Sequence, residues 1–435
     1  MSNKAPGATA HTPTPKYAWV VLFALYMATF AAPLNMLKLP PLMTTIVPTF
    51  FNGDFNKAGL LMSIFSVMGF LLAIPAGFIL KRFGIKPTFL FSLGTIALGA
   101  VLGALATPAL VLMLFAARFI EGIGMGLVMV GAPLAISMWF PAHNRALPTG
   151  LWATCVGVSN VVTLVAAPSI AVAYSWQAVW WICAIFTVIA FVLFAVLFRM
   201  PRPDEMSEAS APPPSSDTEE AQPSLFGGMR NINYWLCGIG FGIYNLVVMA
   251  MCTYLPTYLE LKHNYLLTYE QGIFMNASFV TALIMLASIF SAPGGGYISD
   301  RLGSRKAVVL VSYAVMTLTF LVPFSITGWQ IPVYMLVFGL AGGPIAPILL
   351  AAVPEVSKKP QLIGIGMACS ALCQNAGMFI GPVMFTKIVD VYGGYVRDVA
   401  GRTIGVESQG WAAAGYWMIP ICIIGMIAVW RIKVR

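Results

Sequence analysis

The sequence predicts an all-α membrane protein whose twelve transmembrane helices form two pseudo-symmetric six-helix bundles. The 435 residues are 59% hydrophobic and 9% charged, with a mean hydropathy of +0.85, whereas a soluble domain carries about 25% charged residues. The apolar residues form twelve long stretches, and a polar segment divides the chain near its midpoint. Lipid suits such a chain because helices satisfy their own backbone polar groups.

Each apolar stretch approaches the roughly 20 residues that a helix needs to cross the hydrocarbon core. The first set is 17–37, 58–80, 87–106, 109–138, 147–172 and 176–198. The second set is 231–258, 268–298, 307–327, 330–352, 361–386 and 411–430. We therefore expect an N-terminal segment 1–16, a first bundle 17–198, a linker 199–230 and a second bundle 231–435.

The polar segments predict how the chain crosses the membrane. The 199–230 linker is rich in proline and acidic residues, which is typical of disorder. With both termini and this linker in the cytoplasm, 17 of the 24 Lys and Arg residues lie inside and six outside. The positive-inside rule thus favours cytoplasmic termini in a cell inner membrane. The stretch from Tyr17 is too long for a signal core, so we expect a retained first helix.

Composition and spacing argue against several classes of function. The net charge of +9 falls in short loops between apolar stretches, so it indicates membrane topology and not a nucleic-acid partner. The seven cysteines lie in apolar segments without metal-ligand spacing, and they are expected to be buried hydrophobes. No Walker A sequence or histidine cluster is present. We expect no cofactor, no metal and no enzymatic activity.

Two loops in corresponding positions carry a related pattern. Gly77 to Gly84 follows the second predicted helix, and Gly296 to Gly303 follows the eighth. The second copy reads Gly-x-x-x-Asp-Arg-x-Gly-x-Arg-Lys over 296–306, whereas Lys81 replaces the acidic residue in the first copy. Internal repeats of this kind are typical of transporters whose halves rock about a central site.

These residues resemble the major facilitator superfamily, and the resemblance covers nearly the whole chain. The 296–306 loop matches the family's loop motif, and Arg118-Phe-Ile-Glu-Gly resembles its helix 4 motif. The antiporter motif Gly-x-x-x-Gly-Pro is clearest at 377–382. Within the family, 33–40 resembles the Asn-Leu-Arg-Pro stretch of cyanate-porter-type members, with Lys38 in place of arginine. The resemblance implies an alternating-access secondary transporter that works as a monomer.

The loop motif is a candidate gate. Its glycines allow tight turns, and Asp300 could pair with basic residues or cap a helix across the inner face. Such contacts would hold the halves together and break in the opposite state. The alternative is a plain positively charged loop. The candidate gating residues are Gly77, Arg82, Gly84, Gly296, Asp300, Arg301, Gly303, Arg305 and Lys306.

Arg118 and Glu121 are the candidate coupling pair. They lie three residues apart on one helix face and can pair. Each charge alone in the bilayer would cost about 2.5–3.5 kcal/mol, so each needs a partner or a wet cavity. Glu121 could be a carboxylate that exchanges a proton with alternate sides. The alternative is a neutralised structural ion pair.

Polar residues in other spans are candidate substrate ligands. Lys38 with Asn35 could attract an anion beside a central cavity, or Lys38 could snorkel to the outer interface. Further polar residues either line the passage or form interhelical hydrogen bonds. Tyr254 and Tyr258 are expected in the interfacial aromatic belt. The candidate binding residues are Lys38, Asn35, Arg118, Tyr244, Asn245, Asn276, Gln374 and Asn375.

The functional hypothesis is a secondary transporter for a small organic or inorganic anion, with protons as a possible coupling ion in symport. Lys38 and Arg118 motivate the anion, as does the scarcity of carboxylates within the spans. Two alternatives stay open. One is efflux of hydrophobic or cationic drugs through a pocket lined by some of the 24 methionines. The other is a membrane sensor that binds a ligand without moving it.

Overall fold

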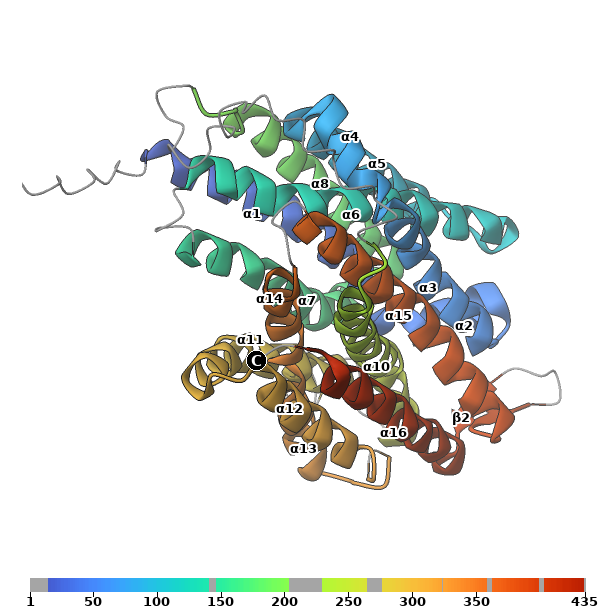
Figure 1. Ribbon diagram of the computed structural model, residues 1–435. Helices are drawn as coiled ribbons and strands as arrows, with labels where there is room; N and C mark the ends of the chain where they lie inside the picture. Colours follow the sequence, from blue (N-terminus) through green and yellow to red (C-terminus); the bar gives the residue numbers. More distant parts are fainter. Residues whose placement is uncertain are drawn as a thin grey trace, which may run out of the picture.

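The computed structural model describes residues 15–140, 146–202, 229–263, 276–322, 324–357, 362–398 and 403–433, and these are nearly all helical (Figure 1). Eleven helices in this part of the chain are long and apolar enough to cross a membrane. The shorter α12, Arg305–Thr319, completes a set consistent with the predicted twelve-helix fold. The predicted N-terminal segment and the 199–230 linker lie mostly outside the described residues.

The helices pack as an amino-terminal half and a carboxy-terminal half (Figure 1). The first half contains α1 (Tyr17–Leu37), η1 (Pro40–Leu42), α2 (Met43–Phe51), α3 (Phe55–Leu72), α4 (Pro75–Phe83), α5 (Ile85–Ala104), η2 (Pro108–Leu110), α6 (Val111–Trp139), α7 (Ala146–Ala173) and α8 (Trp176–Leu197). The second contains α10 (Ile232–His263), α11 (Ala277–Leu302), α12, α13 (Gln330–Gly342), α14 (Ile345–Val356), α15 (Ile363–Val391) and α16 (Ser408–Arg431).

Two predicted helices are interrupted at proline. The span predicted at 58–80 consists of α3 and α4, which are separated just before Pro75. The span predicted at 330–352 consists of α13 and α14, which are separated at Gly343 and Pro344. Proline lacks a backbone N–H and disfavours the helical conformation of the preceding residue. The short helices η1 and α2, which continue the first span, were not predicted.

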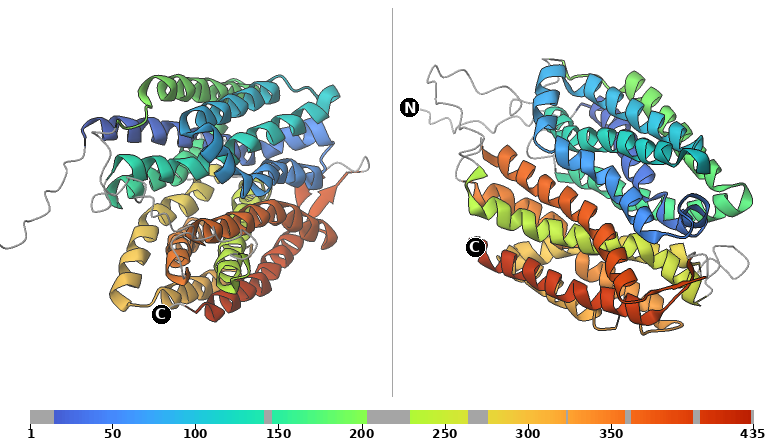
Figure 2. Two further views of the ribbon diagram at one scale, coloured as in Figure 1. Left: turned by 45° about the horizontal axis from the view of Figure 1, so that its top comes forward. Right: turned by 90° about the vertical axis from the view of Figure 1, so that its right-hand side faces the viewer.

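A β-hairpin joins α15 to α16, and no strand was predicted there. β1 (Tyr395–Arg397) pairs antiparallel with β2 (Thr403–Val406). The hairpin projects from one end of the bundle, opposite the end where α16 finishes (Figure 2). We call its side the hairpin end, and the side that carries residues 296–306 the motif end.

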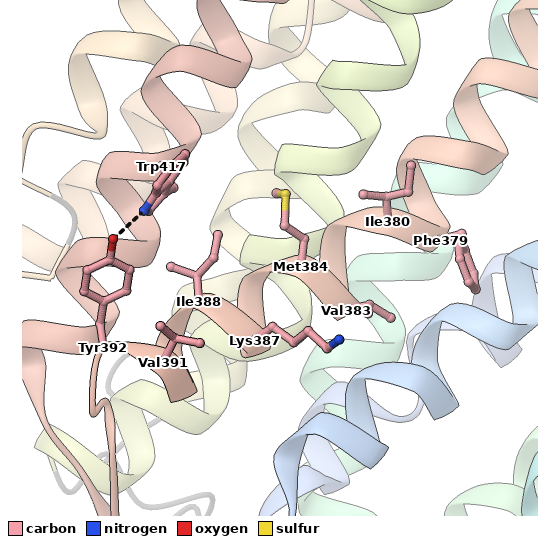
Figure 3. A pocket seen from close by; sticks show the side chains of 9 residues that line it. All are labelled: Phe379, Ile380, Val383, Met384, Lys387, Ile388, Val391, Tyr392 and Trp417. Carbon is pink, nitrogen blue, oxygen red and sulfur yellow. Dashed lines mark hydrogen bonds between the residues drawn. The ribbon is translucent and has the colours of Figure 1, made fainter.

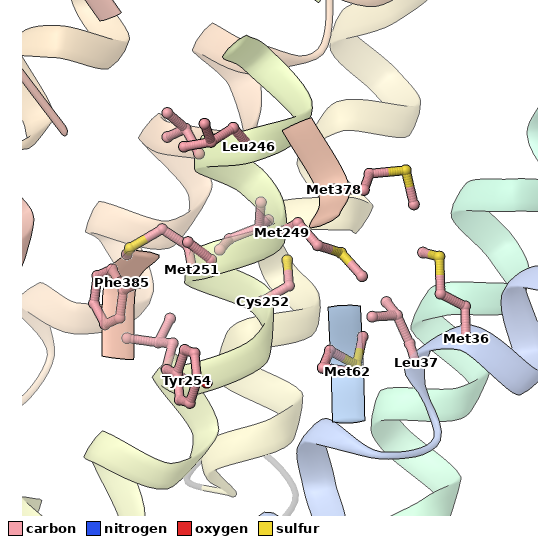
Figure 4. Packing of buried hydrophobic residues seen from close by; sticks show 14 of the residues in the cluster. Met36, Leu37, Met62, Leu246, Met249, Met251, Cys252, Tyr254, Met378 and Phe385 are labelled. Atoms are coloured by element: carbon pink, nitrogen blue, oxygen red, sulfur yellow. The ribbon is translucent and has the colours of Figure 1, made fainter. Parts of the chain in front are cut away.

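The two halves meet along α3 with α15 and along α7 with α11. Glycines allow the close approach: a Cβ at Gly69 would lie 2.1 Å from Asn375 Oδ1, and one at Gly157 would lie 2.6 Å from Ile289 Cγ1. Between these contacts the interface is apolar and rich in sulfur. Methionines from both halves face one another there, together with Cys252 (Figure 4). The facing residues include Met36, Met62, Met249 and Met378.

Cysteines and tyrosines test the burial predictions. All seven cysteines are free, six are buried, and Cys373 is half-buried, which confirms the cysteine prediction. The aromatic-belt prediction is wrong, because Tyr254 and Tyr258 are buried. The Tyr258 hydroxyl donates to the Phe324 carbonyl at 3.0 Å, so its polar group is satisfied inside the protein.

The contact between α5 and α8 depends on the small size of Gly103. A Cβ at this position would lie 1.9 Å from Trp180 Cζ3, whereas one at Gly94 of the same helix meets open space. Overpacking a closed contact typically costs about 1–3 kcal/mol. We predict that Gly103→Ala lowers the melting temperature of the detergent-purified protein, whereas Gly94→Ala does not lower it, because alanine favours a helix interior over glycine. Equal melting temperatures for the two variants would contradict the close packing of Trp180 on α5.

Candidate functional site

Three charged side chains meet inside the amino-terminal half, and we call Lys38, Arg118 and Glu121 the charge cluster. Lys38 Nζ lies 2.6 Å from Glu121 Oε1, and Arg118 Nη1 lies 2.8 Å from Glu121 Oε2. All three side chains are 0% exposed. Glu121 therefore neutralises one of two buried cations, and the fully ionised cluster carries one net positive charge.

The end of α1 explains why two cations gather here. The last carbonyls of a helix have no partner within the helix and carry partial negative charge. Arg118 donates to the Asn35 carbonyl at 2.7 Å and to the Met36 carbonyl at 3.1 Å. Lys38 follows α1 directly as its C-cap residue. The cluster is thus built onto a helix terminus in the interior of the half.

Asn35 and α8 hold the Lys38 ammonium in place. Asn35 Oδ1 accepts from Lys38 Nζ at 2.8 Å, and Asn35 Nδ2 donates to Thr187 Oγ1 at 3.1 Å. The ammonium also lies 3.6 Å from the ring centroid of Trp180, where a cation–π attraction is expected. Lys38 therefore points into the amino-terminal half and does not snorkel to the interface.

Space for Glu121 comes from Gly99 on α5. A Cβ at Gly99 would lie 2.5 Å from Glu121 Cγ and 2.6 Å from the Ala117 carbonyl oxygen. On the opposite side, the Arg118 guanidinium lies 4.5 Å from the ring centroid of Phe65 on α3. Helices α1, α3, α5, α6 and α8 all contribute to the enclosure.

Two N–H donors in this enclosure have no acceptor. Arg118 Nε and Trp180 Nε1 are buried without a hydrogen-bond partner among the described residues. An unsatisfied buried donor costs about 1–3 kcal/mol, and more when it is charged. A net positive charge with spare donors is an environment that attracts an anion.

The other candidate ligands do not join the charge cluster in this conformation. Asn375 lies where α15 meets α3, and its Nδ2 donates to the Ala371 carbonyl. Asn245 donates to Phe241 in its own helix, and Asn276 caps the start of α11. Tyr244 and Gln374 are half-buried on α10 and α15. The structure thus brings together Lys38, Asn35, Arg118 and Glu121.

The loop motif forms the turn between α11 and α12 at the motif end. Gly303 ends α11 at φ +62°, a conformation that favours glycine. Arg305 Nε lies 2.6 Å from Glu355 Oε1, and Lys306 donates to the Ile432 carbonyl at 3.4 Å, both within the same half. Among the described residues, no hydrogen bond or ion pair joins the side chains of Asp300 or its motif neighbours to the amino-terminal half.

The corresponding turn in the first half follows α4. Gly84 ends α4 at φ +82°, and the Arg82 guanidinium lies 5.7 Å from the ring centroid of Phe83. Gly77 lies within α4, where an added Cβ would meet open space. The two motif copies are therefore separate turns in this conformation.

A large apolar groove lies away from the charge cluster. It occupies about 530 Å³ on the outer side of α15 and α16, and Lys387 is the one charged residue that lines it (Figure 3). Trp417 Nε1 donates to the Tyr392 hydroxyl at 3.3 Å near one end. Its position on the outside of the bundle gives it no part in the site described above.

Sequence reasoning missed three members of the cluster's surroundings and one carboxylate. Trp180, Cys183 and Thr187 recur along one face of α8, a signal that could have placed them near Lys38. Glu260 was missed because the predicted span ended at 258, whereas α10 continues to His263. Glu260 lies near Thr44 of α2, in the part of α10 that approaches the amino-terminal half.

The architecture defines a multi-pass helical membrane transporter. The family model of the Major Facilitator Superfamily matches residues 18–282 and 268–435, and the chain belongs to this superfamily. A crystal structure of a bacterial homolog of the human lysosomal transporter Spinster, inward-facing and occupied, matches 96% of this chain and 97% of its own with a TM-score of 0.73. At 13% identity it shows the shared fold.

Three curated relatives that match most of the chain show 23% to 25% identity. The hexuronate transporter of Bacillus subtilis is 24% identical over 81% of this chain and 89% of its own length. A protein named as a probable sulfoacetate transporter of Cupriavidus necator is 23% identical over 81% and 83%. The class B tetracycline resistance protein of Escherichia coli is 25% identical over 80% and 83%. The relatives are transporters and not enzymes.

The pairing within the charge cluster predicts an asymmetry between substitutions. Glu121→Gln leaves two buried cations together, and removing one partner of a buried ion pair typically costs about 3–5 kcal/mol. Lys38→Met leaves the Arg118–Glu121 pair intact and should cost less. We predict a larger fall in melting temperature for Glu121→Gln. Glu355→Gln, which breaks a partly exposed pair, is the control with a small effect. Equal melting temperatures for Glu121→Gln and Lys38→Met would refute the shared-carboxylate arrangement.

Proposed function

We propose that this chain is an alternating-access transporter that moves a small monoanion together with a proton across a bacterial inner membrane. The charge cluster, with one net positive charge and two buried N–H donors that lack a partner among the described residues, is the observation that carries the proposal. Relatives named for hexuronate and sulfoacetate support an anionic substrate. We further propose that the protein acts as a monomer with cytoplasmic termini.

Glu121 would couple the anion to the proton by competition. In the substrate-free cluster the two Glu121 carboxylate oxygens accept hydrogen bonds from Lys38 and Arg118. A proton on Glu121 would remove this negative charge and leave both cations to the arriving anion. The net charge of the cluster is then plus one with or without cargo. The loaded and empty carriers would therefore cross the membrane with equal charge, and transport would be electroneutral.

Access to the charge cluster requires movement, because its side chains are fully buried here. Arg118 is bonded to the end of α1, so a shift of α1 against α6 would open the cluster. The candidate ligands on α10 and α15, namely Tyr244, Asn245, Gln374 and Asn375, would complete the site from the other half. The motif copies would close the motif end when the hairpin end is open.

Efflux of hydrophobic compounds is the second candidate function. The methionine-rich layer between the halves is the observation that favours it (Figure 4), because methionine adapts to varied apolar ligands. The tetracycline resistance relative points the same way. An efflux protein for cations would, however, gain little from a cluster that is already positive.

Uptake into proteoliposomes distinguishes these functions. We predict that an inward proton gradient drives accumulation of a hexuronate, which is a monoanion near neutral pH, and that a clamped membrane potential changes the rate less than twofold. Lys38→Ala should lower uptake at least tenfold. Glu121→Gln should retain exchange of labelled for unlabelled anion but lose accumulation driven by the proton gradient. Lys387→Ala, which removes a lysine from the groove on the outer side of α15 and α16, is the matched control and should behave as the wild type.

Other outcomes would favour the alternatives. Transport of tetracycline with no anion flux would support efflux. Anion-induced thermal stabilisation without any flux would support a sensor. Anion uptake that is unchanged in Lys38→Ala would show that Lys38 does not bind the substrate.

A further inference from the structure

Residues of both halves are bonded to each other at the hairpin end. Thr403 Oγ1 in β2 donates to the main-chain oxygen of Gly53 at 2.7 Å. The rings of Tyr395 in β1 and Phe55 in α3 are stacked, with centroids 5.1 Å apart and planes 7° apart. Thus each strand of the hairpin has a contact with the turn that precedes α3 or with the first residue of that helix.

A third contact involves the end of α15. Asn56 Nδ2 donates to Asp390 Oδ2 at 2.9 Å. The other carboxylate oxygen of Asp390 accepts from Arg397 of β1 at 2.5 Å. Asp390 therefore links the hairpin, its own helix and the amino-terminal half, and bonds of this kind to a charged group are stronger than neutral ones.

The hairpin is fixed to the carboxy-terminal half. The Tyr395 hydroxyl is hydrogen-bonded to Thr386 Oγ1 at 3.0 Å, and burial raises the pKa of this hydroxyl, so it stays neutral. The Gly394 carbonyl accepts from Glu407 N at 3.0 Å and from Trp411 Nε1 at 3.1 Å. The hairpin will consequently move with α15 and α16.

The opposing turn is equally fixed to the amino-terminal half. Asn52 and Gly53 adopt positive φ angles of 52° and 86°. Asp54 caps α3 by accepting from the Asn56 backbone N–H at 2.9 Å. Two rigid surfaces, one from each half, therefore face each other across this contact.

We propose that the β-hairpin is a latch that holds the hairpin end closed and sets the balance between the two states of the transporter. Alternating access separates the halves at one end while they meet at the other. The three contacts exist only while the hairpin end is closed, so they favour that state. At the motif end, by contrast, Arg305 and Lys306 are bonded within their own half. The inference requires alternating access but no particular substrate.

Spin-label distance measurements test the latch without a substrate. Labels at Leu110→Cys and Trp329→Cys would report on the hairpin end, since these residues are exposed there in opposite halves. The native cysteines are buried or half-buried. The protein without the two added cysteines therefore serves as the control for background labelling. The wild-type latch should give mainly the short-distance population.

Substitutions at the Asn56–Asp390 contact should first lower and then restore the short-distance population. Asn56→Asp places two carboxylates together, and we expect the closed-to-open ratio to fall about tenfold, the size of one lost hydrogen bond to a charged group. The swap Asn56→Asp with Asp390→Asn exchanges donor and acceptor and should restore the short population. Thr107→Val, at an exposed position of the same end, is the control without effect.

Two results would overturn the latch. One is an Asn56→Asp distance distribution equal to that of the wild type. The other is a swap variant that stays as open as Asn56→Asp. If Asn56→Asp does not fold, Thr403→Val serves as the second variant, because it removes the bond to Gly53 and keeps the side-chain shape. A working latch with no anion transport would refute the proposed substrate and leave the latch standing.

Discussion

Three charges held out of water determine how the amino-terminal half is assembled. Lys38, Arg118 and Glu121 can be buried because they pair with one another and with the carbonyls that end α1. Gly99 makes room for Glu121, and Trp180 covers the Lys38 ammonium. Buried ion pairs often contribute little net stability because their desolvation is costly. The anion that we propose as substrate would balance the surplus positive charge of this cluster.

The two ends of the molecule are held differently, and in the proposed transport cycle this difference would open a path to the charge cluster. The hairpin end is closed by direct bonds between the halves, such as those of Thr403 and Asn56. At the motif end, Arg305 is bonded within its own half. Interfaces of this kind have discrete alternative arrangements. A shift between them would move α3, which carries Asn56 at the hairpin end and Phe65 beside Arg118.

The helices were predictable from the sequence because lipid requires long apolar segments, and the motif copies identified the superfamily. Arg118 and Glu121 could be paired from their spacing alone. The contact of Lys38 with Glu121 could not, because it joins residues 83 positions apart through the packing of α1 on α6. The hairpin was missed because its strands are three and four residues long, too short for an alternating pattern. Pro75 indicated a break in the second span, but the continuous apolar sequence around it led to the prediction of a single helix.

The central claim is that the anion replaces the Glu121 carboxylate as the partner of Lys38 and Arg118, while Glu121 takes up a proton. Calorimetric titration of the purified protein with its transported anion, in buffers of different ionisation enthalpy, measures the protons taken up on binding. The account predicts one proton per anion for the wild type near neutral pH and none for Glu121→Gln. Anion binding without proton uptake by the wild type would contradict it.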